Sequence, residues 1–154
     1  MKELVSYGLR KVGHWHLSNH KSTKHLSHMH GIQFHLHEDV SCIRDVVYAI
    51  VANETIIYFG ETSAGISSRF QGYRYGNTLE TDTDNRMKKE ITRLLEDDIL
   101  VSIWFAKPIG YLKLPCGEEL EMPASKPLEE LLISKFKPEL NVKNVRKPCT
   151  ITGN

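Results

Sequence analysis

The stretch VVYAIVANETIIYFG, residues 46–60, gives the clearest secondary-structure signal in the chain. β-Branched and aromatic residues fill positions 46–52 and 55–58, and Asn53-Glu54 separates the two runs. Two such runs joined by a tight polar turn are typical of a β-hairpin, and Gly60 is placed to end its second strand. Tyr48 and Tyr58 each belong to one of these strands.

Two helices are predicted after this hairpin. A short one covers residues 64–72, and the polar, glycine-containing stretch from there to Asp82 is expected to be a loop. Asp84 is a candidate N-cap for the second helix, which carries apolar residues at helical spacing to about Glu96.

The last third of the chain predicts a strand, an accessory hairpin and a final helix. Residues 99–106 are rich in strand formers, and Cys116-Gly117 forms a turn between two short extended runs. Ser125 can cap a helix that ends at Pro138 and has apolar residues at helical spacing. This order of elements indicates an α+β domain with a mainly antiparallel sheet covered by helices.

The N-terminal residues differ from the rest in composition. All eight histidines lie between His14 and His37, in a segment of weak periodicity. We therefore expect two parts in the chain. Residues 1–40 form a His-rich arm, which extends from the core or packs on it as a few short elements, and residues 41–154 form the core domain.

Six of the histidines stand in pairs separated by one residue, at 14/16, 28/30 and 35/37. Such pairs could bind zinc in principle. No cysteine stands at ligand spacing, however, and the intervals fit no zinc motif. A histidine-rich metal-binding protein is therefore one interpretation of the chain, but a surface arm is the preferred one.

The bulk properties bound the class of protein. A chain of 154 residues with 40% hydrophobic residues can bury one compact core. The net charge of +1 does not by itself indicate a nucleic-acid partner. Three widely spaced cysteines form no disulfide framework, and we see no apolar segment typical of a membrane span or a signal peptide. We expect a soluble, cytoplasmic protein.

An ordered set of residues connects the predicted elements. Tyr48 and Tyr58 are followed by Arg69 and Tyr73, and far downstream by Glu129-x-x-Leu132-Ile133, Pro138 and Asn141. The set resembles the catalytic core of GIY-YIG nucleases over residues 46–141. It is most similar to the small restriction-endonuclease branch and to phage DNA-degrading endonucleases. The resemblance implies a small, mainly antiparallel three-stranded sheet flanked by helices, with an accessory hairpin.

The resemblance also implies the chemistry. Glu129 matches the glutamate that holds one divalent ion, and Mg²⁺ (or Mn²⁺) suits such an oxygen ligand. Arg69 matches the arginine that contacts the scissile phosphate, for which its planar, permanently charged fork is suited. Tyr48 matches a tyrosine that acts as general base or orients the attacking water. With an ordinary pKa of about 10, it would need cationic neighbours to act as a base at neutral pH.

Three further positions follow from the same resemblance. Tyr58 and Tyr73 match residues that bond the phosphate or the water, and Asn141 matches an asparagine that closes the site. The sequence departs from the pattern where Val46-Val47-Tyr48 lacks a leading glycine. Glu61 stands where a restriction-type relative has histidine, so it could be a second base, an ion ligand, or a charge that repels phosphate.

Taken one at a time, these residues have ordinary structural explanations. Tyr48 and Tyr58 could be half-buried strand aromatics, and Arg69 a solvated charge. Glu129 stands in a first helical turn, where the helix dipole favours acids. Their order and spacing together are what favour the nuclease interpretation.

DNA contacts are expected from charged residues outside this set. The basic ones are offset by several acidic neighbours, so binding should depend only modestly on salt. The candidates are Glu61, Arg74, Arg86, Lys88, Lys89, Arg93 and Lys143.

The sequence thus predicts a Mg²⁺-dependent deoxyribonuclease that cuts double-stranded DNA as a site-specific, type II restriction endonuclease. One active site per chain and two strands to cut predict a homodimer on DNA. One alternative is a phage-type endonuclease with loose specificity that degrades DNA. Another is a catalytically silent DNA-binding module.

Overall fold

A five-stranded antiparallel sheet forms the body of the protein in a computed structural model, which describes residues 1–21, 30–37, 40–75 and 83–142. Its strands run in the order β2-β1-β5-β3-β4. They are β1 (Arg10–Lys21), β2 (His30–Leu36), β3 (Val46–Ala52), β4 (Thr55–Thr62) and β5 (Val101–Ala106). The α+β class is confirmed.

The sheet has five strands where three were expected, because the N-terminal segment supplies two of them. β1 pairs with β5 along Arg10 to Trp15, and β2 pairs with β1 at the edge of the sheet. Trp15 and Ile32 are buried in the main core, which explains why this His-rich segment joins the sheet. Of the paired histidines, His28 lies outside the described residues.

The hairpin predicted over residues 46–60 is formed by β3 and β4, with Tyr48 opposite Gly60. Asn53 begins the tight turn with a left-handed φ of 52°, a conformation that asparagine tolerates better than most residues. β3 lies inside the sheet and is buried on both faces. Its side chains alternate between two hydrophobic clusters, one on each face of the sheet.

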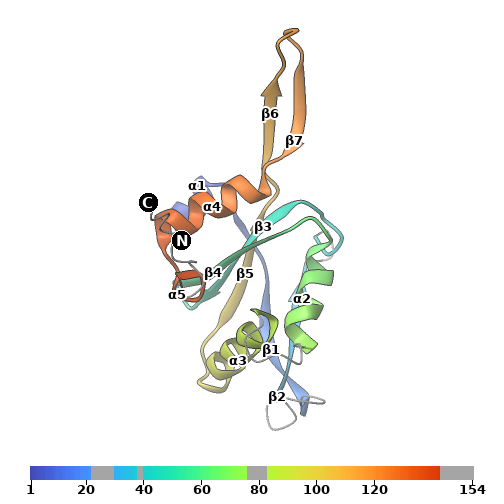
Figure 1. Ribbon diagram of the computed structural model, residues 1–154. Coiled ribbons are helices and arrows are strands. Elements are labelled where there is room, and N and C mark those ends of the chain that lie inside the picture. The colour runs from blue at the N-terminus through green and yellow to red at the C-terminus, as the bar shows by residue number, and fades with distance from the viewer. Residues whose placement is uncertain (22–29, 38–39, 76–82, 143–154) are drawn as a thin grey trace, which may run out of the picture.

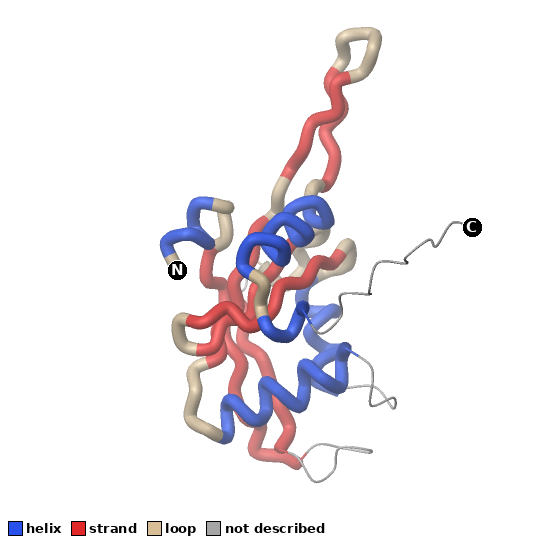
Figure 2. Tube along the Cα trace, turned by 60° about the vertical axis from the view of Figure 1, so that its left-hand side comes forward, coloured by secondary structure: helices blue, strands red, loops and turns tan. Residues whose placement is uncertain are grey.

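Helices cover both faces (Figures 1 and 2). The face that carries Tyr48 packs against α2 (Ile66–Tyr75) and α3 (Thr83–Glu96). The opposite face packs against Leu4 of α1 (Lys2–Ser6) and Leu132 of α4 (Ser125–Phe136). A last short helix, α5 (Glu139–Val142), lies against β4. No helix in the described ranges is long and apolar enough to cross a membrane.

The predicted accessory hairpin consists of β6 (Ile109–Lys113) and β7 (Glu119–Pro123). It projects from the body as an isolated ribbon in both views (Figures 1 and 2). Several of its apolar side chains are about half exposed, namely Ile109, Tyr111, Leu112, Leu120 and Met122. Exposed apolar surface gathered on one element often marks a contact surface.

Candidate functional site

The hairpin β3–β4 brings Tyr48 onto the backbone of its neighbour strand. Tyr48 lies opposite Gly60, and a Cβ at that glycine would clash with the Tyr48 hydroxyl and lie 2.9 Å from a ring carbon of Tyr58. Gly60 is therefore required by the close approach of the Tyr48 ring. The prediction that it ends the strand was wrong, since β4 continues to Thr62.

Arg69 on α2 joins Tyr48 to Tyr73. Its Nε donates to the Tyr48 hydroxyl at 3.3 Å, and its Nη2 donates to the Tyr73 hydroxyl at 3.1 Å. The two hydroxyls are themselves hydrogen-bonded at 2.6 Å. The guanidinium also lies 4.4 Å above the centroid of the Tyr73 ring, a cation–π contact. The structure thus brings together three of the predicted site residues.

Aromatic packing fixes the rings beneath this network. Phe70 meets the Tyr48 ring edge-on at 5.1 Å, and Tyr58 lies 6.3 Å from Tyr48 and 6.4 Å from Tyr73. Edge-to-face and tilted contacts of this length are favourable and restrict ring movement. Tyr58 therefore belongs to the same cluster as Tyr48, Arg69 and Tyr73, which we call the tyrosine–arginine cluster.

The cluster is mostly closed to solvent. Tyr48 and Tyr73 are 0% exposed, whereas the Arg69 side chain keeps 28% of its surface. Burial raises the pKa of Tyr48 well above its ordinary value, and burial likewise raises the pKa of Tyr73. Burial acts to lower the pKa of Arg69, but the Tyr48 and Tyr73 oxygens outweigh it and leave that pKa raised. At neutral pH the cluster holds neutral phenols and one guanidinium cation.

Asp84 is a member of the site that the sequence interpretation missed. It was expected to cap the second helix, but α3 begins at Thr83 and the Asp84 carboxylate accepts from Arg69 Nη1 at 2.8 Å. A Cβ on Gly72 would lie 2.7 Å from Asp84 Oδ2, so this glycine leaves space for the carboxylate. The Arg69–Gly72 spacing was visible in the sequence, but nothing there connected it with Asp84.

Glu129 lies near the start of α4, where residues 125 and 129 are buried. Its side chain is 10% exposed, and its Oε2 accepts from Lys126 Nζ at 2.7 Å. The hydrogen bond that Lys126 donates to Glu129 raises the pKa of Lys126, and the charges of Glu129, Glu130 and Glu61 add to the effect. A cation is therefore already stabilised beside Glu129, in a region we call the carboxylate corner.

Glu61 belongs to this corner. It follows Gly60 on β4 and, because side chains alternate along a strand, it points to the face opposite Tyr48. Its charge acts on Lys126. The edge strand β4 thus connects the two parts of the site, with Gly60 under the Tyr48 hydroxyl and Glu61 in the carboxylate corner.

Asn141 binds the same strand from α5. Its Oδ1 accepts from the Phe59 backbone N–H at 2.7 Å, and its Nδ2 donates to the Phe59 carbonyl at 2.8 Å. These bonds satisfy both backbone groups of one residue on an edge strand, which would otherwise lack a partner on that side. Asn141 therefore holds β4 in place between the two parts of the site.

The predicted DNA contacts are in varied environments. Lys88 is 2% exposed and donates to the Tyr75 carbonyl, and burial, followed by the charge of Arg74, lowers its pKa. Arg93 pairs with Glu90 and Asp97 on the surface of α3. Arg74 lies over the Tyr75 ring, Arg86 is half-buried and Lys89 is exposed. Lys143 lies outside the described residues. Lys89 and Arg93 are the most accessible of the described cations in this group.

Three histidines of the described strands, His14, His16 and His35, lie close together. The His14 ring lies 5.8 Å from His16 and 5.5 Å from His35. Burial, followed by the charges of His16 and His35, lowers the pKa of His14. Within the described part of the chain, no three His, Cys, Asp or Glu side chains are grouped to hold a metal ion.

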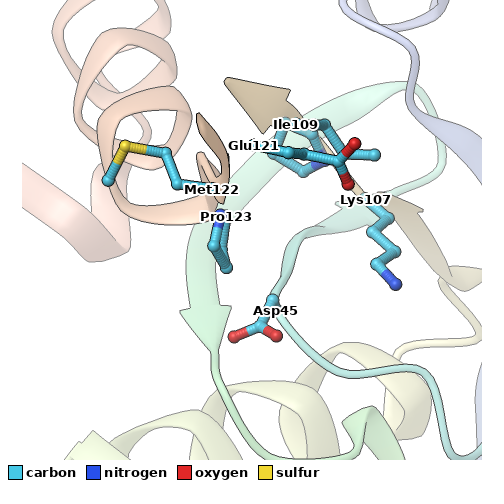
Figure 3. A pocket seen from close by; sticks show the side chains of 7 residues that line it. Asp45, Lys107, Ile109, Glu121, Met122 and Pro123 are labelled. Atoms are coloured by element: carbon cyan, nitrogen blue, oxygen red, sulfur yellow. The ribbon is translucent and has the colours of Figure 1, made fainter. Parts of the chain in front are cut away.

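A pocket of about 150 Å³ lies at the base of the accessory hairpin (Figure 3). None of the predicted site residues contributes to it. Its lining consists of Asp45, Lys107, Pro108, Ile109, Glu121, Met122 and Pro123.

Comparison with known proteins identifies solved structures of similar fold. No protein-family model matches the sequence, and no curated protein sequence matches it significantly. The structure of a point mutant of bacteriophage T4 EndoII aligns with a TM-score of 0.60 over 90% of this chain and 95% of that chain, at 22% identity. The structure of restriction endonuclease HPY188I in complex with product DNA aligns with a TM-score of 0.51 over 99% of this chain and 84% of that chain, at 17% identity. At these identities the likeness shows a shared fold.

Proposed function

We propose that this protein is a metal-dependent DNA endonuclease of the GIY-YIG type, with Arg69 and Glu129 as its catalytic residues. The observation that carries the proposal is the tyrosine–arginine cluster, in which Tyr48 and Tyr73 hold a guanidinium at the surface. The fold neighbours support it, since one is a phage protein named as an endonuclease and the other is a restriction endonuclease bound to product DNA.

Arg69 is the group that contacts the scissile phosphate. A guanidinium has five N–H donors, and bonds to Tyr48, Tyr73 and Asp84 use three of them. Two donors are then left for phosphate oxygens. A donor held in place before the reaction stabilises developing charge without a cost of reorganisation.

Glu129 holds the metal ion. A hard ion such as Mg²⁺ prefers carboxylate oxygen and retains several waters, so one protein ligand is enough. The position of Lys126 supports Glu129 as a cation ligand. The Lys126 ammonium already bonds Glu129, and the charges of Glu61 and Glu130 act on it. A bound divalent ion would polarise the phosphate and stabilise the leaving oxygen. Mn²⁺ has the same preference for oxygen ligands.

The tyrosines act through Arg69. Tyr48 is fully buried under the guanidinium and its pKa is raised by burial, so it is a neutral phenol without solvent contact at neutral pH. Of the two roles implied by the resemblance, this favours orientation over proton abstraction. Glu61 is a partly exposed carboxylate whose charge acts on Lys126, and it is the better candidate to accept the proton of the attacking water.

Duplex DNA is the proposed substrate, and a homodimer is the proposed active form on duplex DNA, with one cut per chain. Site-specific type II restriction is our preferred role. Degradation of DNA with loose specificity, which the resemblance to phage-type endonucleases also allows, is the second candidate.

Incubation with unmethylated phage DNA and Mg²⁺ tests the proposal, with the Glu129→Gln variant and an EDTA sample beside it. Discrete fragments that are lost in both controls are expected for a restriction endonuclease. A smear that is lost in both controls would favour the degradative enzyme. Intact DNA together with a gel shift would contradict nuclease activity and favour a silent DNA-binding module.

A further inference from the structure

The guanidinium of Arg69 is fixed from three elements of the fold. Tyr48 comes from β3, Tyr73 from α2 and Asp84 from α3, and each takes a different nitrogen of the fork. The two tyrosine hydroxyls bond Nε and Nη2, so they restrain the guanidinium from one side only. The carboxylate at Nη1, 2.8 Å away, restrains the other.

Asp84 is also the charged member of this set. Its carboxylate is paired in a partly enclosed position, since its side chain is 21% exposed and that of Arg69 is 28% exposed. The guanidinium is charged in all three bonds, but only Asp84 adds an opposite charge, and its bond is the shortest, so this contact is the strongest of the three on the fork. The neutral phenols alone would hold the guanidinium less firmly.

Gly72 shows that the fold provides space for this contact. Gly72 lies one turn after Arg69 on α2, and a Cβ there would lie 2.7 Å from Asp84 Oδ2 and 3.5 Å from Arg69 Nη1. Glycine inside a helix is unfavourable by roughly 0.5–1 kcal/mol relative to alanine. The Asp84 carboxylate fills the space that a side chain at position 72 would occupy. This indicates that α2 and α3 are arranged around the ion pair.

We propose that Asp84, admitted by Gly72, is a positioning residue that fixes the Arg69 fork so that its two remaining donors meet the phosphate. The inference rests on the proposed function. An alternative is that Asp84 restrains Arg69 and must release it before phosphate binds. The proposal differs from this alternative, because phosphate would bind to donors that Asp84 does not occupy. Removal of the carboxylate should therefore slow cleavage, whereas release of a restraint would accelerate it.

Asp84→Asn is the main test, because it removes the charge and keeps the size of the side chain. The matched control is Asp97→Asn, which breaks an Arg–Asp pair with Arg93 on the exposed surface of α3. Under single-turnover conditions with saturating Mg²⁺, Asp84→Asn should slow cleavage about 10- to 100-fold, the effect of a misplaced catalytic group. The dissociation constant for the duplex should change little, and Asp97→Asn should match the wild type.

Gly72→Ala separates positioning from stability. The added methyl group displaces the flexible Asp84 carboxylate, while alanine favours the helical backbone. This variant should lose cleavage in the same direction as Asp84→Asn and keep or raise its melting temperature. Wild-type cleavage by Asp84→Asn, or faster cleavage with tighter DNA binding, would overturn the proposal.

A second readout does not depend on nuclease activity. The side-chain Nε–H signal of Arg69, assigned with the Arg69→Lys variant, should exchange slowly with water in the free wild-type protein and faster in Asp84→Asn. Equal exchange in the two proteins would overturn the positioning role. If the wild type cuts no DNA, the proposed function fails, and the exchange experiment still decides whether Asp84 fixes Arg69.

Discussion

The tyrosine–arginine cluster and the carboxylate corner lie on opposite faces of the same sheet, and they are built differently. In the cluster, Tyr48 and Tyr73 are fully buried and Arg69 is bonded at all three nitrogens. In the corner, Glu129 has one ion pair with Lys126, whose side chain is 61% exposed. The cluster is held by buried rings and several hydrogen bonds, whereas the corner holds a largely exposed lysine through one ion pair.

On the proposed function, this difference fits the role of each part. A group that stabilises charge on a phosphate works best when it is fixed in advance. On the proposed function, Glu129 would have to release its counter-ion, and the exposed lysine side of the pair makes that exchange easier. The following substitutions change the cluster, the corner or the residue that binds the strand between them.

Among the changes to the tyrosine–arginine cluster, the largest effect is expected for Arg69→Lys. Lysine keeps the charge but cannot bond Tyr48, Tyr73 and Asp84 together while still facing a phosphate. Single-turnover cleavage should fall about 10²- to 10³-fold, the usual loss for one preorganised donor. Arg44→Lys, which changes an exposed arginine that donates to the Ser63 carbonyl, is the matched control and should keep wild-type rates. Similar rates in both variants would show that Arg69 is a solvated charge.

Asn141→Ala should act on stability, because Asn141 satisfies both backbone groups of Phe59 on the edge strand. The loss of two hydrogen bonds in a partly buried position should lower the free energy of unfolding by roughly 1–3 kcal/mol. Urea unfolding at neutral pH measures this. Unchanged stability with lost cleavage would instead mean that Asn141 acts directly on the substrate.

Tyr48→Phe should slow cleavage about tenfold, since the fork loses one of its hydrogen bonds. It should also change the response of stability to alkali. Burial raises the pKa of Tyr48 and Tyr73, so these phenols stay protonated when the unfolded chain ionises. Their contribution is complete at neutral pH and is lost as the pH rises above about 10.

Urea unfolding between neutral pH and pH 11 checks this second effect. The decline in the free energy of unfolding should be shallower in Tyr48→Phe than in the wild type. Tyr111→Phe, which changes an exposed tyrosine of the accessory hairpin, should decline as the wild type does. A cleavage rate that rises with a tyrosine pKa between pH 6 and pH 9 would contradict the buried, neutral phenol.

The smallest effect is expected for Lys126→Met, which removes the competing ammonium from Glu129. The Mn²⁺ affinity, measured by electron paramagnetic resonance with duplex present, should rise about two- to fivefold, since a lysine that is 61% exposed competes only weakly for Glu129. Lys135→Met on the same helix is the control, because Lys135 bonds the Tyr7 hydroxyl. Weaker Mn²⁺ binding in Lys126→Met would mean that the lysine supports the metal site.

Local sequence signals predicted much of this fold. The hairpin over residues 46–60, the helix after Asp84 and the projecting hairpin are all present, because each depends on turn residues or on apolar periodicity over a short range. The strands β1 and β2 were missed. Their many histidines obscure the alternation of apolar and polar residues, in which Trp15 and Ile32 are the buried apolar positions. Their pairing with β5 is a long-range contact that no local pattern reveals.

The candidate site divides in the same way. Tyr48, Tyr58, Arg69 and Tyr73 were predicted, and the structure brings them together. Asp84 and Lys126 were not recognised, because an acid at the start of a helix and a lysine one turn from a glutamate have ordinary explanations in sequence. Only the approach of α3 to Gly72 gives Asp84 its role.

Single-turnover cleavage of one duplex by the wild type, Arg69→Lys, Glu129→Gln and the double variant tests the central claim most directly. If the cluster and the corner act on one phosphate, Glu129→Gln should lose cleavage about 10³-fold or more, and the double variant should lose little beyond the more damaged single variant. Wild-type cleavage by Glu129→Gln, or losses that multiply in the double variant, would contradict a single site shared by the two faces of the sheet.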